Sequence, residues 1–283
     1  MNANELLHLL TLEQIDNNRF RGQNQDIGAA AVFGGQVLGQ ALSAAEATIE
    51  GRPAHSLHAY FLRPGNKTVP IIYDVECVRD GGSFSTRRVI AEQQGETIFI
   101  MSASFQKPEE GLEHQRQMPD VPAPETLPNE SEIRLKMAET LEPERQAFFT
   151  SVRPVEMRPI YPEDLWNKSE RPAHQGFWIR VNADLPDIPG LHRALLAYTS
   201  DFYLMGTALR PHGERFSSSG MLAASLDHAM WFHQDFRMDE WVLYTMDSPI
   251  SGGGRGLNLG HFYKRDGTLV ASCMQEGLIR MAR

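Results

Sequence analysis

The chain has 283 residues, enough for two domains of ordinary size, and its 41% apolar and 22% charged residues are the composition of a globular protein. The formal net charge of −9 argues against a nucleic-acid-binding protein, although a local arginine cluster could still hold an anionic ligand. Cys77 and Cys273 are the only cysteines, which excludes a disulfide framework and a metal-binding cysteine pair.

The N-terminus has neither the basic start nor the apolar stretch of a signal peptide. No run of the sequence reaches the ~18 apolar residues that a membrane helix needs. We therefore expect a cytoplasmic protein with no stable membrane insertion.

The first long helix is predicted over residues 33–49, where small and apolar residues occupy nearly every face. A helix that is apolar all round is buried on most sides. β-branched and aromatic runs follow at residues 71–75 and 88–91, and Gln94-Gly95 marks a tight turn. This part of the chain is therefore predicted to be a buried helix followed by antiparallel strands.

The middle of the chain, from residue 107 to about residue 141, has five prolines and many acidic residues. Such a composition is typical of a linker, here with one short helix that begins near Ser131. We therefore expect an N-terminal domain over residues 1–106, a linker over 107–145, and a C-terminal domain over 146–283 that carries the candidate catalytic residues.

The C-terminal part repeats the first pattern. A helix is predicted over residues 191–209, and helical spacing gives it one largely apolar stripe: Ala194, Tyr198, Asp201 and Met205. Strand-like runs follow at 241–244 and 260–263, and Asp266-Gly267 is a hairpin signal. The two halves together predict an α+β fold, in which an antiparallel sheet curls around a long helix twice.

Residues 56–106 and 225–275 can be aligned as two copies of one unit. Both begin with Ser-Leu, at Ser56 and Ser225, and both end in glutamine, at Gln106 and Gln275, after the same span. This unit is too long for a solenoid repeat of roughly 20–50 residues. A duplicated domain is the simplest interpretation.

Three polar residues of the second copy are candidates for catalysis. Asp201 is a carboxylate on an apolar helix stripe, which is costly unless it is partnered or used. Gln275 alternates in phase with Ala271 and Cys273 and so faces the core. Together with Ser225, these side chains could hold and deprotonate a water molecule. Each residue taken alone could equally be a structural one, satisfied by neighbouring backbone or side chains.

The first copy lacks such a set by this alignment. It has Ser56 and Gln106, but Gly39 and Gln40 occupy the part of its helix where an acid would be needed, and Glu46 lies beyond that point. The sequence therefore predicts one working site in a duplicated scaffold.

Gly34, Gly35 and Gln36 open the first helix. Free N–H groups at a helix N-terminus can bind a carbonyl oxygen or an oxyanion, so these residues are predicted to contact the substrate. A tight turn with close packing would explain the two glycines equally well.

Three segments resemble one known family: VFGGQVLGQA at residues 32–41, SLHAYFLRPG at 56–65 and SLDHAMWFH at 225–233. They are similar to the bacterial acyl-CoA thioesterase II family, and the likeness runs from about residue 7 to residue 280. It implies a double hotdog fold, homodimers or homotetramers, and hydrolysis of medium- to long-chain acyl-CoA without a metal or organic cofactor. It also implies that Asp201, Ser225 and Gln275 are the catalytic set, with serine at 225 where the family has threonine.

Two rival functions remain open at this point. A non-catalytic acyl-CoA-binding protein would need no polar set on its core face. A hotdog enoyl-CoA hydratase would need a histidine a few residues from the aspartate, whereas the first histidine after Asp201 is His212, beyond Pro211.

Overall fold

The computed structural model describes residues 1–139, 150, 152–165, 169–216 and 218–282. Its elements before the linker are α1 (Ala3–Leu10), β1 (Glu13–Asp16), β2 (Arg19–Gly22), α2 (Gly34–Glu46), β3 (Ala54–Phe61), β4 (Ile71–Asp80), β5 (Phe84–Gln93) and β6 (Glu96–Gln106). The linker contains η1 (Pro124–Thr126) and α3 (Glu130–Ala138). Then come β7 (Val155–Pro159), η2 (Pro162–Asp164), β8 (His174–Val181), α5 (Pro189–Ser200), η3 (Met205–His212), β9 (Met221–Ser225), β10 (Asp227–Phe232), β11 (Val242–Gly252), β12 (Arg255–Lys264) and β13 (Leu269–Met281).

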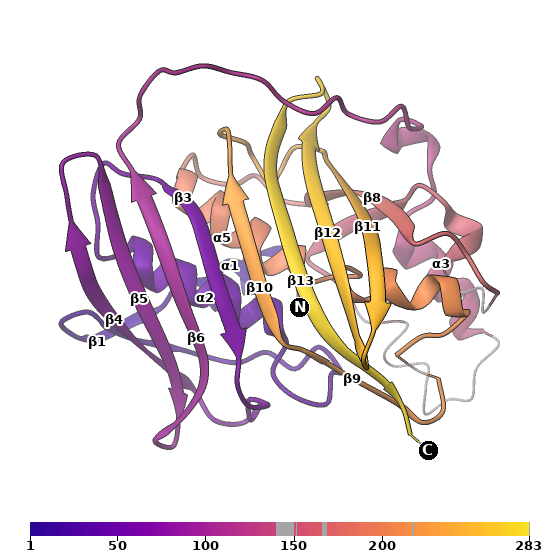
Figure 1. The fold of residues 1–283 in the computed structure, drawn as a ribbon, viewed down its shortest axis with the longest axis horizontal. Coiled ribbons are helices and arrows are strands. Elements are labelled where there is room, and N and C mark those ends of the chain that lie inside the picture. The colour runs from indigo at the N-terminus through magenta and orange to yellow at the C-terminus, as the bar shows by residue number, and fades with distance from the viewer. Residues whose placement is uncertain (140–149, 151, 166–168, 217, 283) are drawn as a thin grey trace.

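The strands form one antiparallel sheet in the order β1-β2-β4-β5-β6-β3-β10-β13-β12-β11-β8-β7, and β9 pairs with β13. The order β4-β5-β6-β3 in the first half matches β11-β12-β13-β10 in the second. The halves meet where β3 pairs with β10, with Leu57 opposite Met230. The sheet lies on one side of the molecule and α2 and α5 lie behind it (Figure 1). The predicted α+β fold with two helix-and-sheet units is confirmed.

The two central helices pack against each other in opposite directions. A Cβ atom on Gly35 would clash with the carbonyl oxygen of Tyr198, and one on Gly39 would lie 2.9 Å from the carbonyl oxygen of Ala194. Glycine at both positions therefore allows the backbones to approach closely. As a result, the N-terminus of α2 lies beside the C-terminus of α5.

The predicted helix over residues 191–209 is wrong at its end, because α5 stops at Ser200 and Asp201 is its C-cap residue. Tyr203 adopts a left-handed conformation with φ of 62°, which no α-helix accommodates. The chain then continues as the 3₁₀-helix η3. Asp201 therefore lies at a helix end and not within the helix, whereas the first predicted helix (33–49) is only slightly longer than α2.

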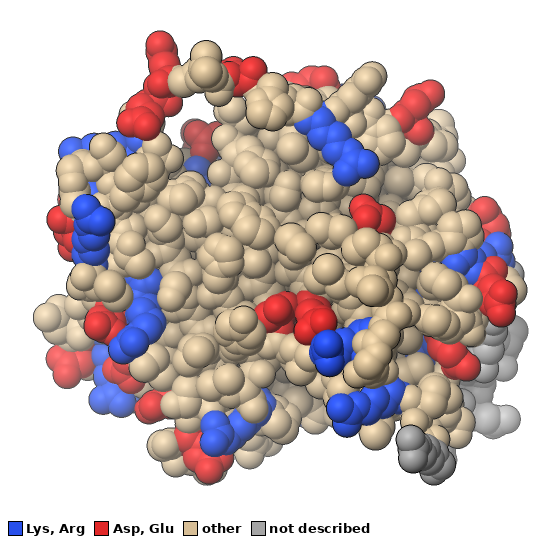
Figure 2. All heavy atoms as spheres, in the orientation of Figure 1, with Lys and Arg blue, Asp and Glu red and all other residues tan. Residues whose placement is uncertain are grey.

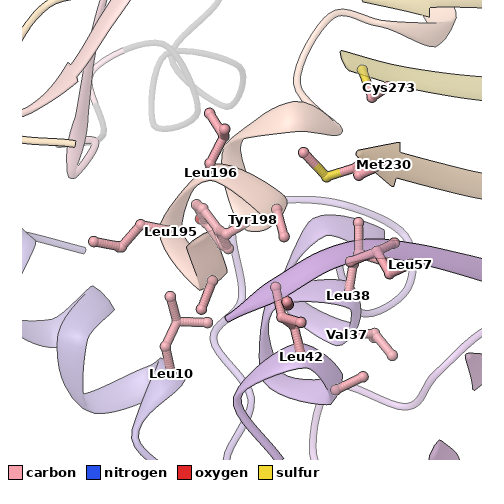
Figure 3. Packing of buried hydrophobic residues seen from close by; sticks show 14 of the residues in the cluster. Leu10, Val37, Leu38, Leu42, Leu57, Leu195, Leu196, Tyr198, Met230 and Cys273 are labelled. Carbon is pink, nitrogen blue, oxygen red and sulfur yellow. The ribbon is translucent and has the colours of Figure 1, made fainter. Parts of the chain in front are cut away.

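The core is continuous through both halves. Leu38 and Leu42 of α2, Leu195 of α5, Leu57 of β3 and Met230 of β10 belong to one buried cluster, seen from close by in Figure 3. Full burial of each such side chain stabilises the fold by about 1.5–3 kcal/mol. The two repeats therefore share one core.

The predicted linker contains one short helix, as the sequence indicates. α3 begins at Glu130, and its N-cap Asn129 accepts a hydrogen bond from the N–H of Ser131, so the short helix predicted near that residue is confirmed. The segment before it is anchored, since Trp178 Nε1 donates to the carbonyl oxygen of Pro122 at 2.9 Å. The boundary at residue 106 stays a prediction. The boundary at residue 145 lies outside the described residues.

Within the described ranges, no helix is long and apolar enough to cross a membrane. The longest α-helix there is α2, which ends after 13 residues.

Glu46 ends α2 at the opposite end of the helix pair from Asp201. A Cβ atom on Gly190, near the start of α5, would clash with the Glu46 carboxylate, so the two are in close contact. Burial raises the pKa of Glu46 from 4.5 to about 7, and the neighbouring Arg193 guanidinium opposes that shift.

Replacing Glu46 with glutamine should stabilise the protein increasingly as the pH rises. A carboxyl group with a higher pKa in the folded state binds more protons when folded, so stability falls between the unfolded value of 4.5 and the folded value of about 7. Melting curves should place Glu46→Gln above wild type at about pH 8 and close to it at about pH 5. The exposed Glu50 is the matched control. An advantage of Glu46→Gln that is equal at both pH values, or shared by Glu50→Gln, would contradict this account.

Candidate active site

The three predicted catalytic residues come together where α5 ends and α2 begins. Gln275 Nε2 donates to Asp201 Oδ1 at 2.7 Å and to Ser225 Oγ at 3.0 Å. The backbone N–H of Gly35 donates to Asp201 Oδ2 at 2.8 Å. The Asp201 carboxylate is therefore held from both sides, once by each repeat of the chain.

Strand geometry explains how Gln275 and Ser225 reach Asp201. Gln275 is fully buried on β13, in phase with Ala271 and Cys273, so its predicted inward orientation is confirmed. Ser225 is the last residue of β9 and pairs with Gly277 of the same strand β13. The side-chain oxygen Oε1 of Gln275 has no hydrogen-bond donor in the described part of the chain. It can therefore accept a hydrogen bond from a bound molecule.

The three residues predicted at the start of α2 have different surroundings. The N–H of Gly35 is already bonded to Asp201, and the N–H of Gln36 donates to the carbonyl oxygen of Phe33 at 3.0 Å. The side chain of Gln36 is buried and bonds the preceding loop, accepting from the N–H of Gln25 at 3.0 Å. A Cβ atom on Gly34 would come within 2.8 Å of Asp201 Oδ2. Substrate contact by these residues stays a prediction, and Gly34 is the best placed of them.

The environment of Asp201 makes it a stronger base than an exposed aspartate. Burial raises the pKa of its carboxyl group above 3.8, and the hydrogen bonds from Gln275 and Gly35 lower it in part. The two donors hold the carboxylate in place while burial keeps it basic. Catalytic acids and bases often lie at the wall of a cavity and have a shifted pKa.

Asp201 borders a cavity of about 760 Å³. This volume is within the range of roughly 300–1,000 Å³ that is usual for small-molecule sites. Much of the wall is apolar: Ile27, Phe33, Leu165, Phe202, Leu209 and Phe216. The same cavity has basic side chains: Arg153, Arg171, Arg210 and Arg215. Acidic side chains line it as well, and Asp164 pairs with both Arg171 and Arg210 at 2.9 Å. The cavity can therefore accommodate an apolar chain beside a group of paired charges.

The first repeat has no matching polar set. On β6 the inward-facing residues Met101, Ala103 and Phe105 are all apolar, while Gln106 lies in the opposite phase and donates to Glu109 at 3.0 Å. The alignment of Gln106 with Gln275 by equal span is therefore wrong in phase. Just beyond the end of α2, the buried Arg87 donates to Thr48 Oγ1 at 2.8 Å.

Asn258 is a buried residue of the site that the sequence analysis missed. It lies opposite Gln275 in the pairing of β12 with β13. Its Oδ1 accepts from the N–H of Ala208 at 3.0 Å, and its Nδ2 donates to the carbonyl oxygen of Gln275 at 3.3 Å. Asn258 therefore fixes η3 to the strand that carries Gln275. Counting back from the predicted hairpin turn at Asp266-Gly267 would have placed it there.

The first histidine after Asp201 does not form the aspartate–histidine pair that a hydratase would need. His212 lies at the end of η3, where its Nε2 hydrogen-bonds with Ser251 Oγ at 2.9 Å. It is not among the residues that line the cavity beside Asp201.

A sheet that wraps a helix twice in one chain defines a double hotdog protein, and the carboxylate, hydroxyl and amide lie at the junction of its two helices. The family described as acyl-CoA thioesterase matches residues 144–278, and the acyl-CoA thioesterase N-terminal domain matches residues 21–106. Acyl-CoA thioesterase 2 of Haemophilus influenzae is 46% identical, covering 99% of this chain and 98% of its own. The chain belongs to the bacterial acyl-CoA thioesterase II family, and it is a thioester hydrolase.

Solved structures agree with this assignment. The crystal structure of acyl-CoA thioesterase II TesB2 from Mycobacterium marinum has a TM-score of 0.79 and 42% identity, covering 97% of each chain. A conserved protein with a hot dog fold from Alicyclobacillus acidocaldarius has a TM-score of 0.75 at 18% identity and covers 98% of each chain. The latter supports the double hotdog fold alone.

Removing the Gln275 amide should move the acid limb of the pH–rate profile to higher pH. The hydrogen bond from Gln275 lowers the pKa of Asp201, so without it the carboxyl group stays protonated to a higher pH and loses its function as a base there. The profile of kcat/KM for Gln275→Ala should therefore fall off at a higher pH than that of wild type. An unchanged acid limb with a lower plateau would mean that Gln275 acts by another route.

Proposed function

We propose that this protein hydrolyses medium- to long-chain acyl-CoA thioesters, using a water molecule that Asp201 deprotonates. The observation that carries the proposal is the hydrogen-bonded set of Asp201, Ser225 and Gln275, in which Asp201 lines a largely apolar cavity. A protein that only binds acyl-CoA would have no use for a buried carboxylate of raised pKa at this point.

The reaction needs one base and one hydrogen-bond donor to the oxyanion. Asp201 takes a proton from the water, whose oxygen then attacks the thioester carbonyl carbon, while Ser225 and the Gln275 amide orient the water. The tetrahedral intermediate collapses with cleavage of the carbon–sulfur bond. The proton held by Asp201 then passes to the leaving thiolate, so that a fatty acid and CoA are released.

The negative oxygen of the intermediate requires a hydrogen-bond donor that has no other acceptor. Gly34 is the first residue of α2, and its N–H has no acceptor among the described residues. Gly34 lies at the positive end of the α2 dipole, and a Cβ atom on it would lie 2.8 Å from Asp201 Oδ2 of the proposed base. We assign the oxyanion contact to this N–H group.

The cavity supports the proposed substrate class. Its apolar wall suits an acyl chain, and burial of each methylene contributes about 0.8 kcal/mol, so binding should strengthen with chain length. Arg171 and Arg210 of the same cavity both pair with Asp164 at 2.9 Å, so a ligand phosphate that binds them would compete with that carboxylate.

Asp201→Asn tests the proposed base, because it keeps the shape of the side chain and removes the proton acceptor. Loss of a general base typically costs about 10²–10⁴ in rate, so kcat on palmitoyl-CoA should fall at least a hundredfold. Release of free CoA, followed with a thiol reagent, is the measurement.

Gln106→Ala is the matched control, since Gln106 is a strand-end glutamine that faces away from the core. It should keep kcat to within about threefold, which allows for indirect packing effects. Circular dichroism and melting curves on every variant exclude unfolding as the cause. Asp201→Asn with near wild-type kcat in a folded protein would refute the proposed base.

We propose further that the protein forms homodimers or homotetramers in the cytoplasm. The centre of the outer sheet face, over β6, β3, β10 and β13, has few charged side chains (Figure 2), and Tyr60 on it is 57% exposed. A second copy could cover the centre of this face while burying few charges. Free Cys77 and Cys273 suit a reducing compartment, and cell fractionation tests the location.

Light scattering coupled to size-exclusion chromatography tests the assembly. Wild type should elute as a dimer or tetramer, and Tyr60→Asp should lower the measured mass by placing a charge in the interface. A wild-type monomer, or an assembly that Tyr60→Asp leaves unchanged, would rule out this interface.

A further inference from the structure

The turn that follows the proposed base contains a strained residue. Tyr203 has φ of 62°, a left-handed conformation that costs a non-glycine residue about 1–3 kcal/mol and persists only when its surroundings enforce it. It lies two residues after Asp201, and its side chain lines the same cavity. The groups that hold Tyr203 therefore also hold the turn that carries the Asp201 carboxylate.

Three contacts enforce the conformation of Tyr203. Its hydroxyl donates to Glu130 Oε1 at 2.7 Å, and its carbonyl oxygen accepts from Gln175 Nε2 at 2.9 Å. Its ring stacks on Phe177, with centroids 4.5 Å apart and an angle of 22° between the planes. Gln175 and Phe177 belong to β8 of the catalytic repeat, whereas Glu130 belongs to the linker helix α3.

Glu130 is a buried carboxylate, and its ion-pair partners offset the cost of that burial. Its residue is 2% exposed, and its carboxylate pairs with Arg134 Nε at 2.9 Å and with Arg153 Nη1 at 3.6 Å. Arg134, one turn along α3, is itself 1% exposed. Burying these charges is costly, and a linker helix that served only as a spacer could keep them in water. Arg153 lines the cavity together with Tyr203.

We propose that Glu130 is a positioning residue, through which the linker helix fixes the Tyr203 turn and so the orientation of the Asp201 carboxylate. The inference rests on the proposed function, because it takes Asp201 to be the base. The linker is then part of the catalytic half of the protein. Glu130 contacts two residues that line the cavity, through the Tyr203 hydroxyl and the Arg153 guanidinium.

Tyr203→Phe removes that hydroxyl and keeps the ring, its stacking and the pairing of Glu130 with Arg134. Small misplacements of a reacting group can cost up to about 10²-fold in rate, so we expect kcat on palmitoyl-CoA to fall about tenfold. KM should change less than kcat, since the cavity wall keeps its ring. Loosening the turn should also weaken the bond from Gly35 to Asp201, which moves the acid limb of the pH–rate profile upward.

Tyr73→Phe is the matched control. The buried Tyr73 donates its hydroxyl to Gln40 Oε1 at 2.7 Å, so this variant loses an equivalent hydrogen bond in the first repeat. Its melting temperature should fall by a similar amount, while kcat and the acid limb stay at wild-type values.

Glu130→Gln provides a second variant, in which a weaker acceptor faces the same hydroxyl. It should lower kcat and move the acid limb in the same direction as Tyr203→Phe. If both variants fold and match Tyr73→Phe in kcat and acid limb, Glu130 is merely structural and the proposal is overturned. That outcome would leave the proposed function intact, because an inactive Asp201→Asn protein tests the base independently.

Discussion

The hydrogen bond from the Gly35 N–H to Asp201 crosses between the two repeats, and it constrains much of the rest of the structure. It requires α2 and α5 to run in opposite directions at close contact, which glycine at positions 35 and 39 permits. It also requires α5 to end at Ser200, so that the next side chain turns toward the start of α2. A single repeat would supply either the donor or the acid, and the duplication supplies both.

The two repeats differ in the polar groups that lie at the end of each central helix. In the second repeat, Gln275 and Asn258 bring amide groups under the end of α5, and the amide of Gln275 partners a carboxylate. In the first, Arg87 donates to Thr48 at the end of α2, where a cation also offsets the negative end of the helix dipole. Each helix end thus has hydrogen-bond partners, and only the end of α5 has a carboxylate among them.

Sequence patterns predicted those features that depend only on neighbouring residues in the chain. The apolar helix at 33–49, the inward phase of Gln275 and the cost of a carboxylate at Asp201 follow from periodicity and burial. The end of α5 and the partners of Glu130 could not be predicted in the same way. Tyr203 carries no local sign of a left-handed conformation, because contacts with Glu130, Gln175 and Phe177, remote in sequence, stabilise it. The phase of Gln106 failed because the alignment began from Ser56 and Ser225, which lie on strands that are not equivalent: Ser56 is within β3, whereas Ser225 ends β9.

Two helix ends of opposite polarity meet at the Asp201 carboxylate, and this explains how one group can be both anchored and basic. The start of α2 donates an N–H group and presents the positive end of its dipole, which favours the anion. The end of α5 presents the negative end of its dipole, and burial removes water, both of which favour the protonated form. Donors alone would make a fixed but weak base, whereas burial alone would leave a basic group without orientation. Because Gln275 adds one further donor from β13, the balance depends on three elements, and displacing any of them shifts it.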